Sequence, residues 1–371
     1  MAYKQEYMEL AIELAKKGTG AVNPNPLVGA VIVKDDRIIG QGYHARYGDL
    51  HAERAAFASL TEDAEGAEMY VTLEPCCHYG KQPPCTLAIV EHGIKKVYVG
   101  SDDPNDKVAG KGIAFLREHG VEVETGVMKA ACDAINPVFF HYITTKLPYV
   151  VMKYAMSMDG KIAAYTGKSQ WITGEAARQH VQETRNWLKG IMVGCNTVLQ
   201  DDPVLTCRIE GGRNPVRIVC DSHLRIPLDC QLVRTAVDVP TIVATLDGAS
   251  DKEKELQQAN VQILQCKEKD GRIDLYDLMV QLGAQDIDGI LLEGGGTLNE
   301  QALAQDIVQE VQVYIAPKII GGAEAKTPVE GKGVPDPNGA YRFAFDRMEQ
   351  VGDDILLRYR KEKREICLQE S

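Results

Sequence analysis

Short β-rich runs alternate with helical segments along almost the whole chain, and the alternation starts afresh near Pro148. Strands that alternate with helices are typical of layered α/β domains. A chain of 371 residues is long enough for two domains of ordinary size. The segment HYITTKLPYV, residues 141–150, is the best candidate boundary. The sequence therefore predicts one α/β domain over residues 1–146 and a second over residues 147–371.

In the first domain, apolar residues at helical spacing predict a helix that begins near Tyr7 and ends before Gly18. Two β-rich runs then meet at Asp35-Asp36, which indicates a hairpin. The remaining pattern predicts strands at 27–33, 37–43, 69–72, 95–100 and 121–125, with helices at 51–60, 85–92 and 112–119.

The second domain repeats the alternation, beginning with a strand at Val150. The chain shows no internal repeat and no low-complexity tract, and we expect the polar tail, residues 361–371, to be frayed. We predict strands at 191–194, 216–221, 241–245, 261–265, 289–295 and 311–316, with helices at 175–188, 251–259, 274–282 and 298–304.

Charge and composition exclude several classes of function. A net charge of −12 disfavours a general nucleic-acid binder, which needs a basic surface. No apolar run is long enough to span a bilayer, and the N-terminal MAYKQEYMELAIELAKK lacks the apolar core of a signal peptide. We therefore expect a cytoplasmic protein whose ten cysteines are reduced thiols, some of them metal ligands.

Three short motifs in the first domain form a candidate zinc site. His51 opens a predicted helix, Cys76 follows a predicted strand in Glu74-Pro75-Cys76, and Cys85 opens the next helix. One histidine and two cysteines can bind zinc and leave the fourth tetrahedral position to water, whose pKa the zinc lowers. Glu53 can take a proton from that water and pass it to a departing amine. The pattern predicts a hydrolytic deaminase.

The alternative is a structural zinc site with a fourth protein ligand, for which Cys77 is the obvious candidate. Adjacent side chains diverge, so we interpret Cys77 as a bystander. Zinc deaminases commonly have two residues between the ligand cysteines, whereas here the longer CHYGKQPP separates Cys76 from Cys85.

The second domain contains one informative local motif, GILLEGGGTLNEQAL, which runs from strand through a glycine cluster to helix. Backbone N–H groups at such a helix N-terminus can bind phosphate. The motif is not the full dinucleotide-binding fingerprint. Gly294-Gly295-Gly296 can equally be a tight turn.

At the level of whole segments, the chain resembles the RibD (RibG) family of bifunctional riboflavin-biosynthesis deaminase–reductases, roughly from Tyr3 to Arg360. In that family the ligand cysteines are widely spaced and Ser usually stands where this chain has Cys77. The deaminase half is matched by NPNPLVGAVIV, GYHARYGDLHAE, YVTLEPCCHYGKQPPC and DPNDKVAGKG. The reductase half is matched by KYAMSMDGKIA, GKSQWITGEAARQHVQETR, VGCNTVLQDDPVLTCR, EGGGTLN and VYIAPKIIGG.

The resemblance implies a fold, two cofactors and a set of binding residues. The fold would be a cytidine-deaminase-like α/β/α sandwich followed by a dihydrofolate-reductase-like α/β domain, with Zn²⁺ in the first and NADPH in the second. Pyrimidine contacts in the deaminase site would come from Asn23, His78 and Lys81. NADPH would contact Ala155, Trp171, Thr197, Asp201, Ser222 and the segment Gly295, Gly296, Thr297, Leu298, Asn299, Glu300 and Gln301. The reductase substrate would contact Lys153, Ser169, Arg185, Leu205, Arg208 and Glu293.

Each of these residues taken singly also has an ordinary structural interpretation. Asn-Pro-Asn-Pro is a good turn sequence, Trp171 can belong to a core, and Arg185 can lie on a solvated helix face. In the reductase step an acid would assist opening of the ribose ring, and both Asp201 and Lys153 are candidates for that acid.

The predicted function is therefore deamination of a phosphorylated diaminopyrimidine, followed by NADPH-dependent reduction of its ribosyl chain. One rival hypothesis keeps the deaminase and makes the second domain a non-catalytic module. Another is a nucleic-acid editing protein, which the charge and the lack of an aromatic-basic strip disfavour. The predicted partner is a small phosphorylated pyrimidine, with no nucleic acid and no membrane, and whether the chain forms a homo-oligomer stays open.

Overall fold

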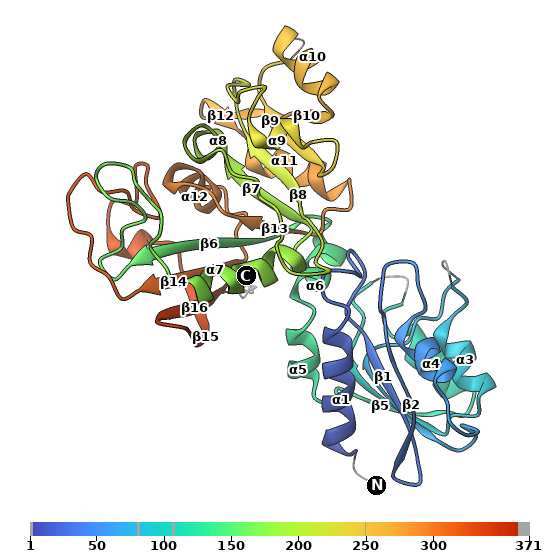
Figure 1. Cartoon of the computed structure of the whole chain (residues 1–371). Coiled ribbons are helices and arrows are strands. Elements are labelled where there is room, and N and C mark those ends of the chain that lie inside the picture. The colour runs from blue at the N-terminus through green and yellow to red at the C-terminus, as the bar shows by residue number, and fades with distance from the viewer. Residues whose placement is uncertain (1–2, 80–81, 106–107, 249, 363–371) are drawn as a thin grey trace, which may run out of the picture. The chain divides into compact units, whose positions relative to one another are not determined.

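The computed structural model describes residues 3–79, 82–105, 108–248 and 250–362. The chain divides into two compact units, residues 1–146 and 147–371. Both contain a β-sheet with helices packed on it (Figure 1), so the predicted α/β class is confirmed. No helix among the described residues is long and apolar enough to cross a membrane.

The first unit has a five-stranded sheet in the order β2-β1-β3-β4-β5. The β1–β2 and β1–β3 pairs are antiparallel, whereas the β3–β4 and β4–β5 pairs are parallel. The strands are β1 (Gly29–Lys34), β2 (Arg37–Tyr43), β3 (Glu68–Leu73), β4 (Lys96–Ser101) and β5 (Glu122–Thr125). The helices are α1 (Gln5–Lys16), α2 (Ala52–Ala58), α3 (Cys85–Glu91), α4 (Lys111–Glu118), α5 (Lys129–Ala134) and α6 (Pro137–Thr145).

Two separate apolar clusters make this unit a three-layer sandwich. One face of the sheet packs against α2, α3 and α4 through residues such as Phe57, Ile89 and Leu116. The other face packs against α1 and α5 through Met8 and Cys132, and these two helices lie together in Figure 1. The observed layers are those of the predicted α/β/α sandwich.

The second unit has a nine-stranded sheet in the order β10-β9-β8-β7-β13-β6-β14-β16-β15. The first seven strands in this order are parallel, and β16 and β15 continue the sheet antiparallel. The strands are β6 (Tyr149–Ser157), β7 (Gly190–Gly194), β8 (Val216–Cys220), β9 (Thr241–Thr245), β10 (Val261–Gln265), β13 (Gly289–Leu292), β14 (Glu310–Ala316), β15 (Phe343–Val351) and β16 (Asp354–Lys361), with a small separate hairpin of β11 (Glu268–Lys269) and β12 (Arg272–Ile273).

Helices cover both faces of this sheet. Leu278 and Leu303, on α11 and α12, belong to the large core, whereas Val181 on α7 packs with Tyr314 in a smaller cluster. The helices are α7 (Glu175–Trp187), α8 (Cys195–Asp201), α9 (Gln231–Arg234), α10 (Asp251–Gln258), α11 (Leu275–Gly283) and α12 (Gly296–Ala304), and a 3₁₀ turn spans Pro337–Gly339.

Several elements differ from the prediction. The strand expected at 289–295 ends at Leu292, because the glycines after it form the turn into α12. The sequence pattern missed α5, α6, α8 and α9, and it missed the β15–β16 hairpin. Most of β15 is solvent-exposed on both faces, so it lacks the alternation that marks a half-buried strand. Lys361 ends β16 and is not part of a frayed tail, and residues 363–371 of that predicted tail lie outside the described part of the chain.

Candidate active sites

The predicted zinc ligands meet at two strand–helix junctions of the first unit. His51 is the residue before α2, Cys76 follows β3, and Cys85 is the first residue of α3. Their ligand atoms all lie within 4.8 Å of one another. His51 Nδ1 is 3.5 Å from Cys76 Sγ and 3.4 Å from Cys85 Sγ.

These separations fit a tetrahedral zinc ion. With Zn–N near 2.0–2.1 Å and Zn–S near 2.3 Å, tetrahedral geometry places N and S roughly 3.6 Å apart. The two distances from His51 Nδ1 are within about 0.2 Å of that value. The donor set, one imidazole nitrogen and two cysteine sulfurs, also suits zinc.

Backbone contacts hold the two cysteines in this arrangement. The N–H of Cys85 points at Cys76 Sγ at 3.4 Å, and the Cys76 carbonyl accepts from the Thr86 N–H at 3.2 Å. Arg54, in the first turn of α2, donates to the carbonyls of Pro83 at 3.1 Å and Pro84 at 3.0 Å. The loop before Cys85 is therefore tied to the helix that begins at His51.

Glu74 fixes the loop on its other side. Its buried carboxylate accepts from the N–H of Gly110 at 3.0 Å, of Gly112 at 3.0 Å and of Ile113 at 3.2 Å, at the start of α4. A Cβ on Gly112 would lie 2.1 Å from the Pro75 carbonyl oxygen, so only glycine allows this close approach. The loop that carries Cys76 is thus locked onto α4.

Glu53 is only 4% exposed and lies in the first turn of α2. Burial, helped by the negative charge of Cys76, raises the pKa of Glu53 to about 6. A hydrogen bond from Cys85, with a further one from His51, lowers the pKa of Cys76 to about 4 against the effect of burial. A carboxyl group that titrates near neutrality suits proton transfer.

The predicted pyrimidine contacts are only partly described. Asn23 is half-buried in the turn before β1, and His78 is half-buried after Cys76. The Nδ1 atom of His78 is buried, and no described residue hydrogen-bonds to it. Lys81 lies outside the described residues.

His44 was not predicted from sequence to belong to the site. It is 3% exposed and packs edge-on against His51, with ring centroids 5.7 Å apart. His44 Nδ1 lies 3.0 Å from the Leu50 carbonyl, so Nδ1 carries the proton and Nε2 accepts from Asn25 Nδ2 at 3.1 Å. Burial lowers the pKa of His44, which agrees with this neutral form. The turn containing Asn23 is thereby linked to the candidate metal site.

Asp103 was also missed. It is 8% exposed, burial raises its pKa to about 6, and the negative charges of Glu74 and Cys76 contribute to that rise. Its position was the signal available in the sequence, because Asp103 follows a predicted strand and lies in a segment that resembles the family.

In the second unit, the predicted cofactor and substrate residues gather at the carboxyl ends of four neighbouring strands, β8, β7, β13 and β6. This edge is where open α/β sheets bind ligands. Ser222 follows β8, Thr197 and Asp201 lie on α8 after β7, and Glu293 follows β13. Ala155 lies within β6 and pairs with Tyr314.

Arg185 and Glu293 form a bidentate ion pair at this edge. Arg185 Nε and Nη2 each lie 3.0 Å from a Glu293 carboxylate oxygen, and Nη1 donates to the Thr206 carbonyl at 2.9 Å. Burial would raise the pKa of Glu293, but the charges of Arg185 and Lys153 outweigh it and lower that pKa to about 2. Burial lowers the pKa of Lys153.

The neighbouring loop, residues 201–208, brings the other predicted substrate residues to this pair. Arg208 is exposed, and its charge also lowers the pKa of Glu293. Leu205 is buried and has a φ of +53°, a left-handed conformation that is costly for leucine. Sparsely populated backbone conformations of this kind cluster at ligand sites.

Trp171 and Ser169 lie between β6 and α7. Trp171 is 61% exposed, so it is not a core residue, and the Arg178 guanidinium stacks over its ring at 4.5 Å. Ser169 is half-buried in the same loop.

In the glycine segment, four predicted residues already have partners inside the protein. Asn299 donates to the Pro328 carbonyl at 2.9 Å, Gln301 donates to the Ile273 carbonyl at 2.6 Å, and Glu300 pairs with Arg272 at 3.9 Å. Leu298 is buried, whereas Thr297 is exposed and its hydroxyl donates to the Glu330 carboxylate at 3.4 Å. Contacts with a phosphate would therefore come from the backbone at Gly295 and Gly296, where α12 begins.

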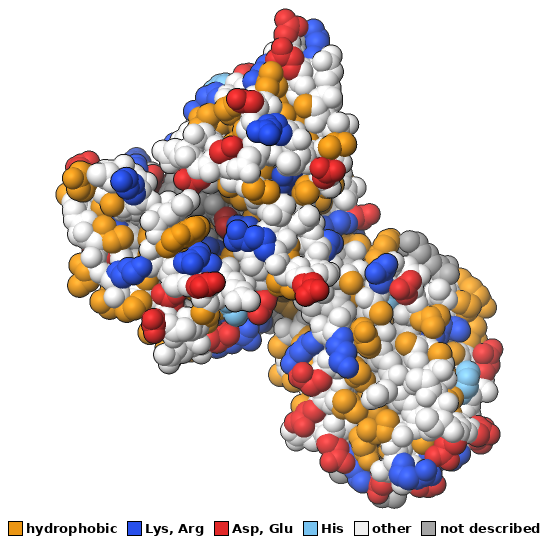
Figure 2. Space-filling model, viewed as in Figure 1, with side chains coloured by type: hydrophobic (Ala, Val, Ile, Leu, Met, Phe, Trp, Pro, Cys, Tyr) orange, Lys and Arg blue, Asp and Glu red, His pale blue; other side chains and the backbone are white. Residues whose placement is uncertain are grey.

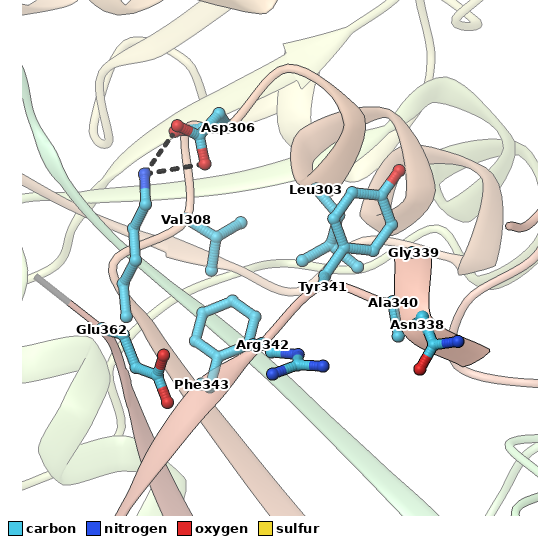
Figure 3. Close-up of a pocket in the computed structure, with 11 residues that line it drawn as sticks. Leu303, Asp306, Val308, Asn338, Gly339, Ala340, Tyr341, Arg342, Phe343 and Glu362 are labelled. Carbon is cyan, nitrogen blue, oxygen red and sulfur yellow. Dashed lines mark hydrogen bonds and ion pairs between the residues drawn. The ribbon is translucent and has the colours of Figure 1, made fainter. Parts of the chain in front are cut away.

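A pocket at the opposite edge of this sheet contains none of the predicted site residues (Figure 3). It lies between the end of α12 and the first residues of β15, with Leu303, Tyr341 and Phe343 in its wall. The Lys361 ammonium pairs with Asp306 at 2.7 Å on its rim.

Charged side chains on the visible surface are mixed in sign. In Figure 2, lysine and arginine side chains alternate with aspartate and glutamate over both units, without a continuous basic strip on the face shown. The view agrees with the net charge of −12.

Each of the two units matches a family of known proteins. Residues 1–101 match the family model of the cytidine and deoxycytidylate deaminase zinc-binding region, and residues 148–357 match that of the RibD C-terminal domain. The riboflavin biosynthesis protein RibD of Actinobacillus pleuropneumoniae is 53% identical over 354 residues, which cover 95% of this chain and 94% of that protein. The RibD protein of Escherichia coli K12 is 37% identical over 364 residues, which cover 95% of this chain and 97% of that protein.

Solved structures agree over the same length. Acinetobacter baumannii RibD has a TM-score of 0.87 at 37% identity, covering 97% of this chain and 99% of that one. A Thermotoga maritima diaminohydroxyphosphoribosylaminopyrimidine deaminase/5-amino-6-(5-phosphoribosylamino)uracil reductase has a TM-score of 0.87 at 38% identity, covering 96% of this chain and 98% of that one. The chain belongs to the RibD family of bifunctional riboflavin-biosynthesis deaminase–reductases.

Proposed function

We propose that this chain catalyses two successive reactions of riboflavin biosynthesis. The first unit deaminates 2,5-diamino-6-ribosylamino-4(3H)-pyrimidinone 5′-phosphate to the aminouracil. The second unit then reduces the ribosyl chain to ribityl with NADPH. The activities named for the Thermotoga maritima relative support both steps. The observation that carries the first is the convergence of His51, Cys76 and Cys85 beside a buried Glu53.

In the deaminase site, His51, Cys76 and Cys85 would hold a zinc ion. When bound, the ion supplies a water that is acidic enough to act as a nucleophile at neutral pH. Glu53 accepts the proton of that water and delivers it to the leaving amine, for which a pKa of about 6 is well placed. Asn23 and His78 orient the pyrimidine from the two loops beside the metal, and Lys81 is proposed to assist them.

In the reductase site, NADPH would lie along the carboxyl ends of β8, β7 and β13. Thr197, Asp201, Ser222, Ala155 and Trp171 would contact it, and the backbone at Gly295 and Gly296 would bind its phosphates. NADPH supplies the hydride, and the protein supplies orientation.

The substrate of the second step would be held by Ser169, Leu205 and Arg208, with the Arg185–Glu293 pair fixing one wall of the site. Lys153 lies close enough to this pair to influence the pKa of Glu293. Its own lowered pKa makes it a better proton donor than an ordinary lysine. Burial also raises the pKa of Asp201. We favour Lys153 as the acid that assists opening of the ribose ring, because Lys153 lies beside the Arg185–Glu293 pair that would form a wall of the substrate site.

A two-stage assay tests the proposal. Purified protein is given the diaminopyrimidine phosphate, ammonia release is followed to completion, and NADPH is then added and its consumption followed. We expect release of ammonia without NADPH, followed by oxidation of one NADPH per substrate. Ammonia release without any NADPH consumption would favour a non-catalytic second unit.

The variant Glu53→Gln separates the two sites. Loss of positioned acid–base catalysis costs about 10²–10⁴-fold in rate, so deamination should collapse. Reduction of pre-deaminated substrate should stay near wild type. If both reactions fall together in a folded variant with normal zinc content, the two-site assignment is wrong.

A further inference from the structure

Arg217 is a fully buried arginine on β8, outside the residues assigned to either site. No carboxylate among the described residues forms an ion pair with it. Burial lowers the pKa of Arg217 to about 10, so it stays charged at neutral pH. Its guanidinium donates only to neutral oxygens: Thr241 Oγ1 at 3.0 and 2.7 Å, Thr235 Oγ1 at 2.8 Å, Val239 O at 2.8 Å, Leu232 O at 3.0 Å and Val204 O at 3.3 Å.

The contact with Val204 reaches the loop that carries the proposed substrate residues. Leu205 follows directly and is held in its left-handed conformation, with a φ of +53°. The Thr206 carbonyl, on the other side of Leu205, accepts from Arg185 Nη1 at 2.9 Å. The costly backbone of Leu205 is therefore flanked by two carbonyl groups, each bound by a different arginine.

Arg217 also fixes the element that supports the start of this loop. It binds the Leu232 carbonyl in α9, and α9 begins at Gln231, whose N–H donates to the Asp202 carboxylate at 2.7 Å. The Gln231 side chain also donates to the Asp202 carbonyl. Asp202 directly follows the proposed cofactor contact Asp201.

We propose that Arg217 is a positioning residue for the reductase step, which acts on the substrate by fixing the backbone around Leu205. A buried charge without an anion is costly, and a neutral side chain could fill the core. The guanidinium instead offers five donors in a rigid fork, which can hold several carbonyl groups of separate segments at once. The inference rests on the proposed function, because it assumes that residues 201–208 contact the reductase substrate.

The test compares Arg217→Lys with the matched control Thr241→Val. Lysine keeps the charge but cannot span the acceptors. Thr241→Val removes two of the buried hydrogen bonds of Arg217 and leaves its contact with Val204. We expect Arg217→Lys to raise KM for pre-deaminated substrate about tenfold or more, with kcat changed by less than about twofold. Thr241→Val should lower the reductase melting temperature without raising that KM.

Amide hydrogen exchange gives a second measurement that does not depend on turnover. Arg217→Lys should speed exchange in peptides covering residues 202–208, and Thr241→Val should not. Equal KM effects of the two variants, or unchanged exchange in that loop with Arg217→Lys, would overturn the proposal.

If Arg217→Lys fails to fold, Thr235→Val can be tested instead, because Arg217 Nη1 donates both to Thr235 Oγ1 and to the Val204 carbonyl. It should raise the substrate KM more than Thr241→Val does, and an equal effect would overturn the inference. Deaminase activity of the same chain reports that the rest of the protein is intact. A wild-type protein without reductase activity would contradict the proposed function itself. An active wild type, together with an Arg217 variant whose substrate KM is unchanged, would contradict only this inference.

Discussion

Replacing Glu74 by glutamine would test how the metal-binding loop is held. The carboxylate accepts three backbone N–H groups while only 4% exposed. The amide oxygen of glutamine can replace the oxygen that binds Gly112 and Ile113, but its NH₂ then faces the N–H of Gly110. Loss of one charge-assisted hydrogen bond costs about 1.5–3 kcal/mol, and one buried unpaired N–H costs about 1–3 kcal/mol. Together they predict a destabilisation of about 2.5–6 kcal/mol.

The assay is thermal unfolding of the full chain, with the deaminase transition identified by loss of zinc to a chromogenic chelator. At about 2–4 °C per kcal/mol, the deaminase transition should fall by about 10 °C. Zinc should also leave faster at a fixed temperature, because Cys76 is two residues beyond Glu74. The reductase transition should not move.

The matched control is Glu124→Gln on β5 of the same sheet. Glu124 pairs with Lys96 at 2.9 Å but is 39% exposed, and such pairs contribute less than about 1 kcal/mol. The idea that the Glu74 carboxylate holds the loop by accepting backbone N–H groups would be refuted in either of two cases. The deaminase transition of Glu74→Gln would stay at the wild-type temperature, or its melting temperature would fall equally in both variants.

Three further predictions follow from the sites. Cys77→Ser should keep one zinc per chain and full deaminase activity, measured by metal content and ammonia release, and zinc loss would make Cys77 a ligand. Arg208→Ala should raise KM for the phosphorylated substrate about ten- to a hundredfold, because a hydrogen bond to a charged group contributes about 1.5–3 kcal/mol. It should raise KM for a dephosphorylated analogue much less. Equal rises in KM for the two substrates would show that Arg208 does not bind the phosphate. The pKa of Glu293 is lowered from 4.5 to about 2. Its pairing with Arg185 should therefore stabilise the reductase unit above about pH 4.5, and this stabilisation should be lost as the pH falls toward 2. Glu293→Gln should flatten this part of an acid-unfolding curve.

The convergence of the three candidate metal ligands could be predicted from sequence because its chemistry is local. His51, Cys76 and Cys85 fall within one stretch of the chain, with His51 and Cys85 at the starts of α2 and α3 and Cys76 in the loop after β3. Their residue types carry the chemistry, so spacing and type were enough to bring them together in one hypothesis. The α/β class was predictable for a similar reason, since the alternation of strands and helices is written along the chain.

His44 and Glu74 show what that reasoning misses. Their roles depend on which segments fold against them: His44 on the turn at Asn25, and Glu74 on the start of α4 more than thirty residues later. A histidine or glutamate near a strand end has no spacing rule that reveals such a partner. Arg217 was missed for the opposite reason, because an arginine in a β-rich run gives no sign that it will be completely buried.

The β15–β16 hairpin was missed although a signal was present. Val351 pairs with Asp354, so Gly352-Asp353 forms a two-residue turn, with Gly352 at a φ of +64°. A glycine followed by aspartate between two β-rich runs is a recognised hairpin signal. The charged residues of β15 concealed it, because an edge strand exposed on both faces need not alternate.

The close approach of Gly112 to Pro75 has a consequence for protein engineering. A designer who transplants the three metal ligands and Glu53 into another scaffold carries over the reactive groups without the frame that shapes them. That frame includes a position with no side chain, Gly112, which lies 27 residues after Cys85 in the sequence and is not one of the proposed metal ligands. The smallest portable version of this centre therefore extends to the first turn of α4, and a graft that ends at α3 should bind metal in a loop free to change shape.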